Sequence, residues 1–314
     1  MCVQRLTTSL ANADSARTTV LAKWILPREM REVSGLALTS DGRLLTHGDE
    51  RGRVYVIDPR GGALLKRFSI GNSQADASAD FEGITVAGER IFMVASNGML
   101  YEFRQGEDGE RVAFTVHDTR LGHECEFEGV AFDAAQGIVV LPCKNVGTRQ
   151  LRDHLVLYRW RLAGSGDSTL APLTIPLRTV IGSNSWKGLH PSDITVDPAT
   201  GNYVLVAAQE KALIEITPSG DVVRAIPLPG KHGQAEGVAL TPDGILIVGD
   251  EATTKRAATL TLYRWPLTAA KAGPPWPSSG NRLTPYARLP SRLCWRRSPG
   301  ALVARTERAR PLAP

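Results

Sequence analysis

One short phrase recurs five times along this chain, and it limits the fold more than any other feature of the sequence. In its fullest form, residues 234–251 (QAEGVALTPDGILIVGDE), it gives an acidic turn, a short apolar strand, a Pro-Asp-Gly turn and a second apolar strand. Short strands rich in β-branched residues between turn residues are typical of an antiparallel meander. The aligned residues of the copies, at spacings of 48, 46, 64 and 44, are Gly35, Gly83, Gly129, Asp193 and Gly237. A period of about 40–50 residues with about four strands per unit predicts the blades of a β-propeller.

The strand count also predicts how the ring of blades closes. Four copies are followed by a third strand and an outer strand, and the outer strands of the first two are residues 64–70 and 111–117. The fifth copy ends with its third strand at residues 260–265, whereas an unassigned strand, residues 20–27 (VLAKWILP), precedes the first copy. An open ring would expose two unpaired strand edges, which promote aggregation. The sequence therefore predicts an all-β, five-bladed β-propeller in which residues 20–27 complete the last blade.

The charge of the chain is divided between a propeller body and a tail. The propeller is expected over residues 18–267, with a disordered N-terminus at 1–17 and a Pro/Gly linker with an Arg-rich disordered tail at 268–314. Residues 281–314 hold eight arginines and one acid, which leaves a net charge of −2 on residues 1–280 out of the total of +5. We therefore expect no nucleic-acid binding by the propeller body.

The beginning of the sequence and the cysteines bear on localisation. Residues 1–16 lack the apolar core of a secretory signal peptide, so the chain as written is expected in the cytoplasm if its start is correct. The four cysteines show no CxxC spacing, which argues against a metal–thiolate or redox motif. Cys125 and Cys143 fall at blade positions, and we expect them to be buried thiols rather than a disulfide.

Acidic residues precede the inner strand of most copies in the same register. Inner strands line the axis of a propeller, so the residues just before them are expected to converge at one mouth of the channel. The candidates for binding a metal ion there are Glu32, Asp80, Glu82, Glu126, Glu128, Asp193, Glu236 and Asp250. Glu82, Glu128 and Glu236 are the strongest candidates because they occupy one register. Clustered carboxylates repel one another unless a cation or a bound proton neutralises them.

Oxygen donors without usable thiolates favour a hard cation. Ca²⁺ accepts six to eight such donors in loose geometry, and Mg²⁺ or Mn²⁺ is the alternative. The competing interpretation is that these acids cap strands, bind nearby backbone amides and face water.

The loop at residues 181–189 (IGSNSWKGL), before the fourth copy, is unusually long. Long loops on a rigid scaffold often carry binding residues. Trp186 in this loop is expected either to stack on a ligand or to cover the mouth of the channel. His190, just after it, is interpreted as a hydrogen-bonded structural residue, with a role as ligand or base as the alternative.

The phrases SGLAL, DFEGITV, EFEGVAF and QAEGVALTPDG resemble the SdiA-regulated family, the YjiK-like bacterial propellers. The resemblance covers residues 18–265 and implies a five-bladed propeller with a calcium site. Carried over by motif, the acidic positions of that family fall on Glu32, Asp80, Glu82, Glu126, Glu128 and Glu236, and the fourth blade offers Asp193 where the others have glycine. The resemblance also implies a periplasmic or cell-envelope location and membrane association.

Two functions follow from these expectations. The first is a calcium-binding, extracytoplasmic module that engages a small molecule or a protein at the channel mouth. The alternative is a metal-dependent hydrolase of a phosphoester, lactone or other ester, in which the ion polarises the substrate and a carboxylate acts as base. A protein-interaction scaffold with solvated acids is a third possibility.

Overall fold

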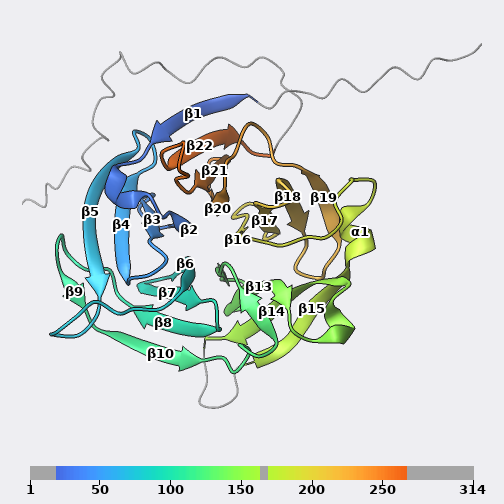
Figure 1. The fold of residues 1–314 in the computed structure, drawn as a ribbon, viewed down its shortest axis with the longest axis horizontal. Helices are drawn as coiled ribbons and strands as arrows, with labels where there is room; N and C mark the ends of the chain where they lie inside the picture. Colours follow the sequence, from blue (N-terminus) through green and yellow to red (C-terminus); the bar gives the residue numbers. More distant parts are fainter. Residues whose placement is uncertain (1–18, 163–168, 267–314) are drawn as a thin grey trace, which may run out of the picture. The chain divides into compact units, whose positions relative to one another are not determined.

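The computed structural model describes residues 19–162 and 169–266, and these form five mainly antiparallel sheets around a common axis (Figure 1). The first two sheets are β2 (Ser34–Leu38), β3 (Leu44–His47), β4 (Arg53–Asp58) and β5 (Ala63–Ile70), then β6 (Phe81–Ala87), β7 (Arg90–Ala95), β8 (Met99–Phe103) and β10 (Phe114–Asp118). The third contains β11 (Cys125–Phe127), β12 (Ala131–Asp133), β13 (Ile138–Val146), β14 (His154–Arg161) and β15 (Thr169–Pro176). The fourth contains β16 (Asp193–Val196), β17 (Tyr203–Ala207), β18 (Ala212–Ile216) and β19 (Val222–Pro227). The predicted five-bladed propeller is confirmed.

The fifth blade is closed by the N-terminal strand. It contains β20 (Ala235–Leu240), β21 (Ile245–Asp250) and β22 (Thr259–Arg264), and its outer strand is β1 (Val20–Ile25). The two ends of the propeller pair antiparallel, with Trp24 opposite Leu260, and in Figure 1 the blue β1 lies beside the orange β22. The predicted closure is therefore confirmed. Short helical segments occur at Arg28–Met30, at Arg149–Leu151 and at α1 (Leu177–Ile181).

One outer strand is divided between two blades. Residues 111–117 were expected to form a single outer strand of the second blade. Instead β9 (Arg111–Val112) pairs parallel with β5 of the first blade, and β10 pairs antiparallel with β8 of the second. The side chain of Arg111 explains the first pairing in part, since its guanidinium binds Asp76, which follows β5. The expectation of one continuous strand was wrong, and the segment joins the outer edges of two neighbouring blades.

The apolar core is divided among the interfaces between neighbouring blades. Buried side chains of the first and second blades, such as Leu45 and Phe81, form one cluster, and each other pair of neighbouring blades shares a similar cluster. The second strand of each blade is almost entirely buried because it packs against blades on both sides. Removal of apolar surface from water stabilises the fold by about 25 cal/mol per Å². The five packed interfaces therefore hold the blades in place, and the blades position the loops that connect their strands.

The aligned glycines allow the inner strands to touch backbone to backbone around the axis. A Cβ atom at Gly83 would lie 2.6 Å from the Cα of Gly129, and one at Gly35 would lie 2.9 Å from the Cα of Gly83. No side chain fits at these positions without moving a neighbouring blade. Asp193 takes the equivalent position in the fourth blade, and its side chain is wholly buried.

Cys125 and Cys143 form a disulfide, so the expectation of buried free thiols was wrong. The two cysteines lie on β11 and β13, which pair antiparallel, and an irregularity in register occurs between Glu126 and Phe127. Their Cα atoms are 5.6 Å apart, within the usual range for a disulfide. The bond therefore ties the inner edge of the third blade to its second strand.

The terminal segments predicted to be disordered, residues 1–17 and 268–314, lie outside the described residues. Among the described residues, no helix has the length and apolar character needed to cross a membrane.

Candidate functional site

Five carboxylates from three blades gather around one lysine at the predicted mouth. We call this group the acidic mouth, and its members are Asp80, Glu82, Glu126, Glu128 and Glu236, together with Lys144. Glu82 lies on β6 and Glu236 on β20, whereas Glu128 follows β11 in the break before β12. The structure therefore brings together the three glutamates that the shared register had singled out.

Lys144, on β13, supplies positive charge at the acidic mouth. Its Nζ forms an ion pair with Glu128, whose side chain is 8% exposed, and Asn145 next to it donates to Glu126. Burial lowers the pKa of Lys144, but the hydrogen bond and charge of Glu128 outweigh this effect and raise it. Burial also raises the pKa of Glu128 against the pull of Lys144. One ammonium group thus faces several carboxylates.

Glu82 and Glu236 hold their protons far more tightly than ordinary glutamates. Burial, followed by the charges of Glu128 and Asp80, raises the pKa of Glu82 to about 9. Burial, followed by the charge of Glu128, raises the pKa of Glu236 to about 7. Both shifts have the cause expected of carboxylates withdrawn from water beside like charges. At neutral pH the acidic mouth retains protons that a bound cation could replace.

The other five predicted ligands have different surroundings. Asp80 and Glu126 belong to the acidic mouth, but Glu32 belongs to a neighbouring acidic group that it forms with Asp49 and Glu251. Burial, then the charge of Asp49, raises the pKa of both Glu32 and Glu251. The charge of Glu251 also reaches Glu236, so the two acidic groups adjoin.

Asp250 is occupied by protein hydrogen bonds. Its carboxylate accepts from His232 Nδ1 at 2.8 Å, from the backbone N–H of Gly233 at 2.9 Å and from the Thr259 hydroxyl at 3.2 Å. Burial acts to raise the pKa of Asp250, but the hydrogen bond and charge of His232 and the other donors outweigh it and lower the pKa. Asp250 thus holds the loop before β20 rather than joining the acidic mouth.

Asp193, on β16, links its own blade to two others through hydrogen bonds. Its Oδ2 accepts the backbone N–H of Val238 at 2.7 Å and that of Leu36 at 3.3 Å, from the fifth and first blades. Its Oδ1 has no hydrogen-bond partner among the described residues and lies against Gly129 of the third blade. Burial raises the pKa of Asp193 well above its usual range, although backbone donors oppose this.

The donor chemistry and the placement of these residues give different answers about a metal ion. Oxygen donors with raised pKa values suit a hard cation. Within the described residues, however, no three histidine, cysteine, aspartate or glutamate side chains are arranged so that they could hold one. As placed, the carboxylates fit a metal ion in charge but not in geometry, and Lys144 provides the positive charge.

The raised pKa of Glu82 leads to a pH-dependent stability. The unfolded chain releases this proton near the ordinary pKa of 4.5, whereas the folded chain holds it until about pH 9. Between these values the unfolded state binds fewer protons, so the free energy of unfolding falls as pH rises. Glu82→Gln is expected to make the free energy of unfolding less dependent on pH and to raise it at pH 8 by about 1–3 kcal/mol. This is less than the full pKa shift corresponds to, because solvent screens part of the effect. Thermal unfolding from pH 5 to 9 in a chelator measures this effect.

Glu89→Gln is the matched control, because the Glu89 side chain is 82% exposed. It should leave the pH profile unchanged. If Glu82→Gln and the parent protein lost stability in parallel between pH 5 and 9, Glu82 would have an ordinary pKa and the electrostatic description of the mouth would be wrong.

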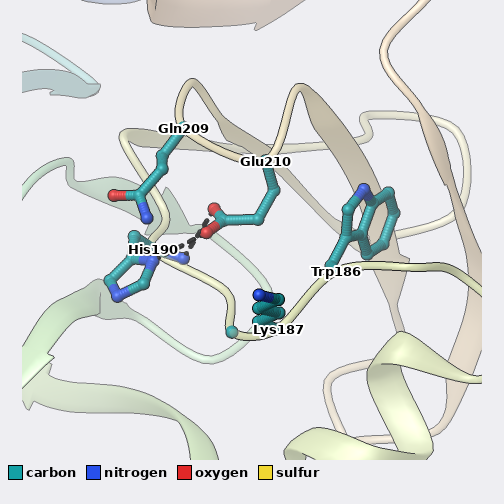
Figure 2. Close-up of a pocket in the computed structure, with 6 residues that line it drawn as sticks. Trp186, Lys187, His190, Gln209 and Glu210 are labelled. Carbon is teal, nitrogen blue, oxygen red and sulfur yellow. Dashed lines mark hydrogen bonds and ion pairs between the residues drawn. The ribbon is translucent and has the colours of Figure 1, made fainter.

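A pocket of about 360 Å³ lies beside the entry to the fourth blade (Figure 2). Trp186, Lys187, Gly188, His190, Gln209 and Glu210 line it. His190 is hydrogen-bonded through its ring to Glu210 at 2.7 Å, as the structural interpretation of this histidine predicted. Trp186 lies in the wall of the pocket and packs in part against the apolar cluster between the third and fourth blades, and its two predicted roles stay predictions.

The family comparison locates the sequence signal in the fourth and fifth blades. A family model described as SdiA-regulated matches residues 177–264. The resemblance to the SdiA-regulated family is confirmed. The match begins at α1 and ends at β22, so it includes the pocket, Asp193 and Glu236. No curated protein matches the chain.

Solved structures share the fold of this propeller at low sequence identity. The PQQ-bound aldose sugar dehydrogenase from Streptomyces coelicolor is 13% identical over 80% of this chain and 99% of its own, with a TM-score of 0.51. The glutaminyl cyclase of Myxococcus xanthus is 14% identical over 79% of this chain and 97% of its own, also with a TM-score of 0.51. These similarities concern the fold alone.

Two functional features were missed by sequence reasoning. Lys144 was not among the predicted site residues, and it lies among the acids because β13 runs antiparallel to β11. Glu210 was not among the predicted site residues either, and it binds His190 through both carboxylate oxygens. The one sequence signal for this pairing was that His190 comes just before the inner strand of the blade and Glu210 comes just after its second strand.

Proposed function

We propose that this SdiA-regulated propeller is a binding module whose acidic mouth takes up a calcium ion. Glu82, Glu128 and Glu236 are the proposed ligands, and Asp80 and Glu126 add negative charge. The observation that carries the proposal is the raised pKa of Glu82, about 9, and of Glu236, about 7. Carboxyl groups held in this state are stabilised when a cation replaces the proton. Because no three of these carboxylates are arranged to hold an ion among the described residues, the proposal requires their side chains to rearrange around it.

Calcium is favoured over its competitors by the type of donor. Ca²⁺ accepts many oxygens in loose geometry, whereas Mg²⁺ requires near-ideal octahedral geometry and retains several waters. Carboxylate donors also suit Mn²⁺. A site that must form from separate blades by side-chain movement suits the ion with the least strict geometry.

Thermal unfolding with added Ca²⁺ tests the proposal. An ion that binds the folded state stabilises it by about 2.7 kcal/mol at 100 times its dissociation constant. We expect Tm to rise on addition of millimolar Ca²⁺ and to return to its starting value with a chelator. Mg²⁺ and Mn²⁺ serve as the competing ions in the same experiment.

Paired variants locate the response. The double variant Glu82→Gln/Glu236→Gln should lose the Ca²⁺-dependent rise, and Glu89→Gln should keep it, since the Glu89 side chain is exposed and pairs with Arg104 rather than with a residue of the mouth. An unchanged Tm in 10 mM Ca²⁺, confirmed by the absence of binding heat in calorimetry, would disprove calcium binding.

An extracytoplasmic location is part of the same proposal. Disulfides persist in oxidising compartments and are rare in the cytosol, and the Cys125–Cys143 bond supports such a location. Calcium outside the cytoplasm reaches the millimolar range that fills sites of modest affinity. The proposed partners are a small molecule or a protein that meets the propeller at the mouth.

A metal-dependent hydrolase of a phosphoester, lactone or other ester is the second candidate. The observation that favours it is Glu236, whose pKa of about 7 suits proton transfer at neutral pH. Assays of phosphoesters, lactones and simple esters, with and without Ca²⁺, test this candidate. Turnover that disappears in Glu236→Gln while Ca²⁺ still raises Tm would favour the hydrolase over the binding module.

A further inference from the structure

The pocket of the fourth blade is built separately from the acidic mouth. One wall is the segment 186–190 before β16, and the other is the turn at residues 209–210 between β17 and β18. Its volume of about 360 Å³ falls at the lower end of the range of small-molecule pockets, about 300–1,000 Å³. The pocket is thus suited to a ligand of about one ring.

Glu210 fixes the orientation and the tautomer of His190. Its Oε2 accepts the backbone N–H of His190 at 3.1 Å, and its Oε1 accepts the ring Nδ1–H at 2.7 Å. The Glu210 side chain is 6% exposed, whereas that of His190 is 31% exposed. A neutral imidazole that donates through Nδ1 carries its lone pair on Nε2. Figure 2 shows this second nitrogen pointing away from Glu210, where it can accept a hydrogen bond from a ligand.

The rest of the lining offers one flat apolar wall and two polar groups. Trp186 is half-buried, so part of its indole is available to a ligand while the rest packs on the core. Lys187 and Gln209 are exposed and offer an ammonium donor and an amide that both donates and accepts. Gly188 leaves room for the imidazole, since a Cβ there would lie 3.1 Å from its Cε1.

We propose that this pocket binds one ring of a neutral polyhydroxylated ligand, either a free monosaccharide or the terminal ring of a glycan. The C–H face of such a ring is apolar and can pack on the indole of Trp186. Its hydroxyls can donate to His190 Nε2 and accept from Lys187 and Gln209. A cationic ligand does not suit the site, because both oxygens of Glu210 already accept hydrogen bonds from His190.

Titration followed by NMR tests the proposal on the full chain. The protein contains six tryptophans, and the indole N–H signal of Trp186 is identified as the one that Trp186→Phe removes. We expect at least one of D-glucose, D-galactose, D-mannose and N-acetyl-D-glucosamine to shift this signal with saturation in the millimolar range. The binding should weaken at least tenfold in His190→Ala, which removes the acceptor, and in Glu210→Gln, which removes its orientation.

Lys231→Ala is the matched control for Lys187→Ala. We expect Lys187→Ala to weaken binding and Lys231→Ala to leave it unchanged. A Trp186 signal that none of the four sugars moves at 100 mM, with far-UV circular dichroism showing a folded protein, would overturn the proposal. So would a sugar-induced shift of equal size and affinity in His190→Ala. A response to Ca²⁺ alone would likewise assign the pocket to cation binding and not to sugars.

Discussion

Asp193→Ala is expected to lower the free energy of unfolding by about 2–6 kcal/mol. The substitution leaves two buried backbone donors, the N–H groups of Leu36 and Val238, without their acceptor, and each unsatisfied donor costs about 1–3 kcal/mol. These donors belong to the first and fifth blades, which meet where the N-terminal and C-terminal parts of the propeller join. Loss of the carboxylate therefore weakens the ring at its closure. Urea unfolding followed by circular dichroism measures the change.

Asp193→Asn separates the hydrogen bonds from the charge. Burial raises the pKa of Asp193 well above its usual range, so a neutral amide of the same shape can keep an oxygen acceptor toward Val238. We expect this variant to lose much less stability than Asp193→Ala. Asp243→Ala, at an exposed turn, controls for the general effect of removing an aspartate. Equal stability of Asp193→Ala and the parent protein would show that the axial hydrogen bonds do not hold the blades together.

The fold was predictable because the information for it is local and repeated. Each copy carries its own turn residues and apolar strands, so five weak signals agree with one another. The position of β1 followed from counting strands, since a fifth blade of three strands needs a partner for β22. The division between β9 and β10 was not predictable in this way. It depends on Arg111 meeting Asp76 of another blade, a contact between residues that are distant in sequence.

The acidic mouth was predictable in register but not in detail. Glu82, Glu128 and Glu236 converge because equivalent positions of a symmetric fold converge. Asp250 departs because a nearby histidine, His232, captures its carboxylate. Asp193 departs because its neighbours at equivalent positions are glycines, which leave space on the axis for its side chain. Registers identify which residues approach the axis, whereas local hydrogen-bond donors decide where each side chain finally points.

Removal of the disulfide by Cys125→Ala/Cys143→Ala is expected to lower the free energy of unfolding by about 3 kcal/mol. The bond closes a loop with a sequence separation of 18, and a cross-link of this size restricts the unfolded chain by about that amount. The sequence contained a usable signal for it. A hairpin that turns near Gln136 places Cys125 and Cys143 on paired strands, although Cys125 is opposite Val146 and Cys143 is opposite Phe127. Thermal unfolding in the absence of reductant measures the loss.

Reductant provides the internal control for this prediction. It should destabilise the parent protein and leave the double variant unchanged, because the variant has no bond to break. Thiol labelling of the denatured, unreduced protein adds an independent test, since the chain has four cysteines and the disulfide protects two of them. Labelling of all four in protein prepared under oxidising conditions would contradict the bond.

Protein prepared in a reducing cytoplasm and in an oxidising compartment should differ in Tm by the same amount that the double variant loses, because both comparisons remove the same cross-link. That agreement would connect the stability of the third blade, which carries Glu128 and Lys144, to the compartment in which the acidic mouth is proposed to bind calcium.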